Sequence, residues 1–200
     1  MIFFIGDGNK AGSMRTTAQL YFKSMMCNQF KRSLRQDTDA SQVYTQSFRV
    51  PLLSIDMNGH MTNSRYHTCM DYVHVSFMMD TGIWEYAFNN QANPVVSSAF
   101  IRFRRSLHWG DPFEVQFRLI SIHGGYFFSE IQFIKDDFVY CQALRKFSVH
   151  KKGQGMIAAE RVLTDLDQPL VSQDLPDYMD LWQTAELSFK KQALSPGLSE

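Results

Sequence analysis

The sequence predicts an α+β fold in which a curved antiparallel β-sheet wraps around one long central helix. A strand-like run precedes a long segment with apolar residues at helical spacing, and the rest of the core segment alternates apolar with polar residues. Short, glycine-rich or charged turns separate the alternating runs, which favours hairpins and therefore antiparallel pairing. One helix covers a sheet of this size only if the sheet curls around it.

The predicted helix begins just after a turn. The first strand runs over residues 48–55 and ends near Asp56, and residues 56–60 are rich in turn formers. Thr62 or Asn63 then supplies the helix N-cap, and Gly82 ends the helix. One helical face gathers apolar residues at the i, i+3, i+4, i+7 and i+11 positions: Tyr66, Cys69, Met70, Val73 and Phe77.

Four strands are predicted after Pro94, where the apolar period changes to two. They cover residues 99–104, 113–119, 126–134 and 138–150. A Trp-Gly-Asp-Pro turn at residues 109–112, a Gly-Gly turn at 124–125 and a charged turn at 135–137 separate them. We therefore expect a meander in which successive strands are neighbours.

Segments of different character flank this core. Residues 1–42 are predicted to be an N-terminal extension with a helix over 14–36, residues 43–155 the folded domain, and residues 156–200 a C-terminal tail. In that tail the segment 177–194 has helical spacing. Its expected docking residues are Leu181, Trp182, Leu187 and Phe189.

Composition narrows the class of function. Lys plus Arg equals Asp plus Glu at 20 each, which argues against broad nucleic-acid binding because that needs a basic excess. No apolar run is long enough to predict a transmembrane segment. The three cysteines, Cys27, Cys69 and Cys141, form no metal-ligand spacing and are expected to be reduced thiols of a cytoplasmic protein.

Two motifs frame the predicted helix and the strands after it. They read Asp56-Met-Asn58-Gly59-His60-Met61-Thr62-Asn63-Ser64-Arg65-Tyr66 and Phe103-Arg104-Arg105-Ser-Leu107-His-Trp-Gly110-Asp111-Pro-Phe113-Glu-Val115. In this order they resemble the motifs of hotdog-fold acyl-CoA thioesterases of the 4-hydroxybenzoyl-CoA thioesterase type. The similarity spans about residues 43–150, and the long extensions resemble the branch near thioesterase-superfamily member six. Thr62 stands where the family pattern has Asn, and both residue types cap helices.

The resemblance implies hydrolysis of an acyl-CoA or acyl-carrier thioester, with Asp56 as the catalytic carboxylate. Asp56 would act either as the general base on water or as the nucleophile. The backbone N–H groups near Asn63 and Ser64, at the positive end of the helix dipole, would stabilise the oxyanion. The alternative for Asp56 is a turn residue whose side chain hydrogen-bonds to the backbone.

Most of the other candidate residues have two interpretations. His60 either orients Asp56 or the substrate or is an ordinary turn histidine, and Asn63 is either a cap or part of the catalytic set. Asn58, Gly59 and Tyr66 are candidate substrate-binding residues, although Tyr66 also suits the helix core. The phosphates of coenzyme A need cations, and the candidates are Arg102, Arg104 and Arg105. The alternative is that these arginines are solvated charges on the face of a strand.

No metal or redox cofactor is expected, and the protein is expected to be a homodimer or homotetramer, since dimerisation would cover exposed sheet edges. Two alternatives stay open. An enoyl-thioester hydratase would need a Pro and a differently spaced His in the first motif. A non-catalytic module would bind acyl thioesters, lipids or a partner protein without hydrolysing anything.

Overall fold

The computed structural model describes residues 38–193, so the helix predicted over residues 14–36 and the thiol of Cys27 lie outside the described residues. The main elements follow the predicted order of a strand, a long helix and further strands. In chain order they are β1 (Tyr44–Arg49), η1 (Leu52–Ser54), α2 (Asn63–Asp80), α3 (Ile83–Asn89), β2 (Ala92–Phe103), β3 (Pro112–His123), β4 (Tyr126–Lys135), β5 (Phe138–Lys151), β6 (Gly155–Ile157), α4 (Ala159–Asp165) and α5 (Asp177–Ala193).

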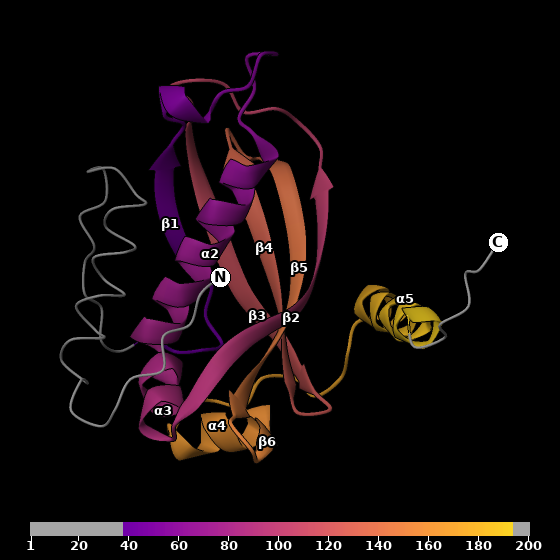
Figure 1. The fold of residues 1–200 in the computed structure, drawn as a ribbon. Helices are drawn as coiled ribbons and strands as arrows, with labels where there is room; N and C mark the ends of the chain where they lie inside the picture. Colours follow the sequence, from indigo (N-terminus) through magenta and orange to yellow (C-terminus); the bar gives the residue numbers. More distant parts are fainter. Residues whose placement is uncertain (1–37, 194–200) are drawn as a thin grey trace. The chain divides into compact units, whose positions relative to one another are not determined.

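The strands form one antiparallel sheet with the order β1-β3-β4-β5-β2, and β6 adds to β5. Helix α2 lies against one face of this sheet (Figure 1). We call that face the inner face and the opposite one the outer face. The curled antiparallel sheet with its central helix confirms the predicted α+β fold class.

Aromatic side chains fill the space between α2 and the inner face. The Phe77 and Phe117 rings lie 4.4 Å apart between centroids, and the Tyr66 and Phe133 rings 5.0 Å apart. Removing such side chains from water is the main stabilising term for the fold. All five apolar positions predicted for the helix face are buried, which confirms the helical period read from the sequence.

Helix α5 packs on the outer face. Met179 is fully buried against Phe128 and Leu144, and Trp182 makes an edge contact with Phe128. The helix itself and the docking of Trp182 were predicted correctly. The prediction was wrong for three other docking residues, because Leu181, Leu187 and Phe189 are exposed on the sides of the helix turned away from the sheet.

The first strand was misplaced by the sequence pattern. It covers Tyr44–Arg49 rather than residues 48–55, and Leu52–Ser54 form a 3-10 helix. Pro51 explains the difference, because proline has no N–H to donate to a neighbouring strand and its fixed φ suits the start of a helical turn.

The predicted meander is wrong for one strand. β2 does not pair with β3, its neighbour in the chain, but with β5 on the far side of the sheet. The pairing runs from Ala92↔Lys151 to Phe103↔Cys141, with a register shift between Val96 and Ser98. The segment 104–111 is therefore a crossing connection rather than a hairpin turn. The two hairpins at residues 124–125 and 136–137 are present as predicted.

Besides η1, three short elements were not predicted. Helix α3 follows α2 directly, because Gly82 at φ +82° turns the chain and begins a second helix instead of only ending the first. Strand β6 and helix α4 lie where a tail was expected. No helix within residues 38–193 has the length and apolarity needed to cross a bilayer.

Candidate functional site

Asp56 begins a tight hairpin between η1 and α2. The Asp56 amide donates to the His60 carbonyl at 2.9 Å, the Gly59 amide donates to the Asp56 carbonyl at 3.1 Å, and Ile55 bridges Met61. Gly59 has a φ of +77°, a conformation that residues with a Cβ rarely adopt. A backbone requirement therefore explains the glycine at this position of the first motif.

The second motif folds onto this hairpin. The Met61 amide donates to the Leu107 carbonyl at 2.7 Å, and residues His60 and His108 form a β-bridge. Their imidazole rings meet edge to face with centroids 5.2 Å apart. Two segments about fifty residues apart in the chain thus form one site at the start of α2.

The Asp56 side chain is exposed and ionised. Its Oδ1 accepts hydrogen bonds from the amides of Asn58, at 2.8 Å, and His60, at 3.1 Å. The bond from the His60 amide is the main reason that the pKa of Asp56 lies below its usual value. These bonds are those of a turn-forming aspartate, and they also fix the direction of the carboxylate.

The first turn of α2 lies directly after the hairpin. Thr62 is in the N-cap position with extended backbone angles, but its Oγ1 contacts the Ser64 Oγ at 3.1 Å rather than capping a backbone amide. The side chains of Asn63 and Ser64 are exposed. Their amides lie in the first turn, where the helix itself offers no acceptor. They can therefore serve as donors to a bound oxyanion.

His108, which bridges the hairpin at His60, also contacts the ion pair of Asp111 and Lys135. The His108 amide donates to Asp111 Oδ2 at 2.8 Å, and Lys135 Nζ donates to Asp111 Oδ1 at 2.8 Å. Burial works to raise the pKa of Asp111, but the Lys135 ammonium and the His108 amide keep it below its usual value. Sequence reasoning missed His108 as a site residue, although it lies inside the second motif.

Tyr66 is buried one turn into α2. Its ring packs on Phe103 at 5.2 Å and on Phe133 at 5.0 Å between centroids. Burial raises the pKa of the phenol to about 12, so the hydroxyl stays protonated at neutral pH. The side chain anchors the start of the helix in the core.

The three candidate arginines are exposed but do not lie together. Arg102 pairs in register with Gln142, on the outer face. The amides of Arg104 and Arg105 both donate to the Tyr140 carbonyl, and the Arg105 guanidinium lies over the Phe138 ring at 4.4 Å. Arg104 and Arg105 therefore belong to the connection that leads into the second motif, whereas Arg102 faces away from α2.

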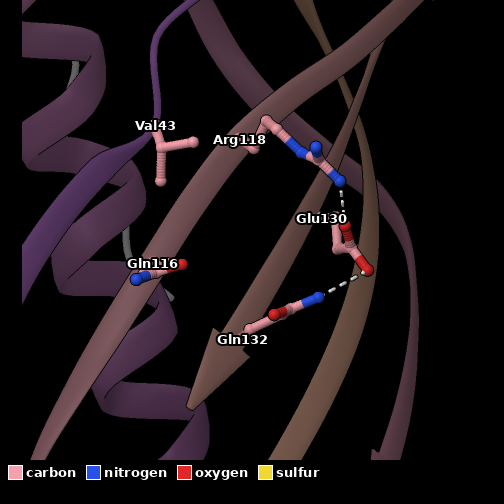
Figure 2. Close-up of a pocket in the computed structure, with 5 residues that line it drawn as sticks. All are labelled: Val43, Gln116, Arg118, Glu130 and Gln132. Carbon is pink, nitrogen blue, oxygen red and sulfur yellow. Dashed lines mark hydrogen bonds and ion pairs between the residues drawn. The ribbon is translucent and has the colours of Figure 1, made fainter. Parts of the chain in front are cut away.

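A small polar pocket lies on the outer face, away from Asp56. Figure 2 shows Arg118 and Gln132 directed toward Glu130, which is almost fully buried. Glu130 accepts from Arg118 at 2.8 Å, from Gln132 at 3.1 Å and from Gln142 at 2.6 Å. The pocket is lined by Val43, Gln116, Arg118, Glu130 and Gln132. Within residues 38–193 no three His, Cys, Asp or Glu side chains are placed to hold a metal ion.

Comparisons with known proteins agree with this fold. The family model of the thioesterase-like superfamily matches residues 50–185. Protein THEM6 of Danio rerio is 29% identical over 133 residues, which is 66% of this chain and 66% of that protein, so the chain spans about two thirds of this relative.

Two solved structures show the same fold. YbaW, a probable thioesterase from Escherichia coli, superposes with a TM-score of 0.58 at 18% identity, over 64% of this chain and 99% of YbaW. The hypothetical protein SAV2348 from Staphylococcus aureus, solved in complex with CoA, gives 0.58 at 16% identity, over 72% of this chain and 95% of that one.

Proposed function

Because the chain belongs to the thioesterase-like superfamily, we propose that it hydrolyses acyl-CoA or acyl-carrier thioesters with Asp56 as the catalytic carboxylate. The observation that carries the proposal is the meeting of the two motifs at the start of α2. There the hairpin with the ionised, exposed carboxylate of Asp56 leads into the first turn of α2, whose amides have no acceptor in their own helix. Hydrolysis needs these two features, one group to attack or to activate water and another to hold the oxyanion.

Two routes use these residues. As general base, Asp56 takes a proton from water while the water oxygen bonds to the carbonyl carbon, and collapse of the tetrahedral intermediate breaks the C–S bond and releases the thiol. As nucleophile, Asp56 bonds to the carbonyl carbon and expels the thiolate, and water then cleaves the anhydride. In both routes the amides of Asn63 and Ser64 are the proposed oxyanion donors, and neither uses a metal or redox cofactor.

A low pKa makes Asp56 a weak base in the isolated chain. A bound thioester, or a second copy of the chain over the site, would remove water from the carboxylate and raise this pKa. Strand β2 suits such a partner, because its exposed edge carries Val95, Val96 and Phe100. We therefore include a homodimer or a larger homo-oligomer in the proposal.

The proposed roles of the other residues follow from their positions. His60 contributes an imidazole beside the carboxylate, and Asn58 and Gly59 shape the hairpin that a bound thioester would contact. Arg104 and Arg105 are the proposed partners of the CoA phosphates, and Tyr66 is a buried support for the helix start. Cys69 and Cys141 are buried free thiols, which suits the proposed cytoplasmic location.

The test is thiol release from a panel of acyl-CoAs by the full chain. Asp56→Asn keeps a turn-forming side chain and should lower kcat by about 10²–10⁴. Asp136→Asn is the matched control, because Asp136 is an exposed turn aspartate with φ +50°, a conformation that Asn tolerates. Equal activity in the wild type and Asp56→Asn would contradict the proposed role.

A non-catalytic binding module is the second candidate. The turn hydrogen bonds of Asp56 favour it, because they give the residue a structural reason to be present. In that case no acyl-CoA of any chain length would release thiol. Calorimetry would still detect acyl-CoA binding, and Asp56→Asn would bind as well as the wild type.

A further inference from the structure

Arg145 is a buried cation on the inner face of the sheet. Its side chain projects from β5 toward α2, where its Nη2 donates to Asp71 Oδ1 at 2.7 Å. The residue is only 3% exposed. Its Nε and Nη1 have no hydrogen-bond partner among the described residues. A buried donor without a partner costs about 1–3 kcal/mol, so two on one side chain are a feature that needs an explanation.

A second buried polar group lies close by. His74 is one helical turn beyond Asp71, and its ring lies between Phe117, at 5.3 Å, and Phe147, at 4.4 Å. Its Nε2 also has no partner within residues 38–193. Two side chains between α2 and the inner face, those of Arg145 and His74, therefore have buried nitrogens without a hydrogen-bond partner among the described residues.

The Asp71–Arg145 pair lies along α2 from the proposed oxyanion site at Asn63 and Ser64. Ser64 and Asp71 are seven residues apart, so they lie on the same side of α2, about 10 Å apart along its axis. Both side chains are exposed. Ala99, the neighbour of Arg145 on the edge strand β2, has a small and exposed side chain. Arg145 is therefore one strand in from an open edge.

We propose that Arg145 selects acyl groups that carry an oxygen acceptor, such as a hydroxyl or a carboxylate, about 10 Å from the thioester carbon. The inference rests on the proposed function, because it takes the thioester carbonyl to lie at Asn63 and Ser64. An acyl group that follows the exposed side of α2 from there reaches the Asp71–Arg145 pair two turns later. An oxygen at that depth accepts from Nε or from Nη1, while Asp71 keeps its bond to Nη2.

The experiment compares acyl-CoAs of graded length in three matched series, which end in a methyl, a hydroxyl or a carboxylate. A hydrogen bond to a charged donor is worth about 1.5–3 kcal/mol, so at one length the wild type should prefer an oxygen-bearing acyl group about 10- to 100-fold in kcat/KM. The hydroxyl and carboxylate series separate a neutral acceptor from an anionic one. If the protein does not hydrolyse these compounds, calorimetry measures their dissociation constants, and the ratio of the constants for the methyl-ended and oxygen-bearing compounds replaces the ratio of kcat/KM.

Arg145→Met removes the donors and keeps most of the volume, and it should bring the ratio to about one by weakening the polar substrates alone. Lys146→Met is the matched control, because Lys146 is the next residue of β5 and faces Glu186 on the outer face.

If Arg145→Met does not fold, Asp71→Asn tests the same pair and should change the ratio. A wild type without preference at any length, or an Arg145→Met that keeps it, overturns the inference. Failure of all hydrolysis with an intact binding ratio overturns the proposed function instead.

Discussion

The two faces of the sheet treat a buried charge in opposite ways. On the outer face Glu130 is buried, but three side chains donate to it, so its charge is fully compensated. On the inner face Arg145 is just as buried, but it has one carboxylate partner and two nitrogens without any among the described residues. A fully compensated charge leaves no polar atom without a partner, whereas a partly compensated one leaves buried donors that an added acceptor would satisfy.

Burial affects the nearby titratable groups accordingly. On the outer face, burial works to raise the pKa of Glu130, but the side-chain hydrogen bonds from Gln142 and Arg118 hold it below its usual value. On the inner face, burial is the main cause that lowers the pKa of His74 to about 3, and the Arg145 charge adds to it. The outer face therefore keeps Glu130 ionised, and the inner face keeps His74 neutral beside the Arg145 charge.

The largest expected effect is on the outer face. Glu130→Ala leaves Gln132 and Gln142 without their acceptor and should lower the free energy of unfolding by about 2–3 kcal/mol. Urea denaturation measures this. Glu114→Ala is the control, because Glu114 is exposed on β3, and it should change stability by less than about 0.5 kcal/mol. Similar stability of the two variants would show that the compensated cluster is not a stabilising one.

A pH-dependent loss of stability is expected from His74. The unfolded chain binds a proton at this residue below about pH 6.5. The folded protein does not bind it until the pH approaches 3. His74 therefore leaves stability unchanged above pH 7 and lowers it as the pH falls from about 6.5 toward 3, by about 2 kcal/mol at pH 5.

Denaturation of the wild type and of His74→Leu at pH 7 and pH 5 isolates this effect, because all other titrating groups are shared. The wild type should lose about 2 kcal/mol more than the variant between the two values. Equal losses would mean that His74 takes up its proton in the folded protein as readily as in the unfolded chain, so that burial does not keep it neutral.

The smallest expected effect on stability is that of Arg145→Met. Replacing a buried, partly paired charge by an apolar side chain of similar volume is often neutral or stabilising, and Asp71 is mostly exposed and can be solvated. We expect a change below about 1 kcal/mol in the free energy of unfolding at pH 7. A loss above about 3 kcal/mol would make this pair as structural as the one around Glu130 and remove the contrast between the faces.

Sequence periodicity alone determined the local elements. The apolar spacing from Tyr66 to Phe77 defined the buried face of α2, and the alternation from Phe113 to Leu119 defined β3. Both follow from the local geometry of helix and strand, so nearby residues are sufficient to predict them. The turn at Asp56 and its place before the helix were likewise predictable, because turn formers and caps act within a few residues.

Only the tertiary structure decided which elements meet. β2 pairs with β5 rather than with its neighbour in the chain, because hydrogen bonding between strands depends on the sheet edge that is free and not on chain order. His108 joins the site through contacts with the Asp56 hairpin, and α5 docks through Met179 rather than Leu181. The position of Arg145 under α2, with two nitrogens that have no partner among the described residues, depends on packing between segments far apart in the sequence.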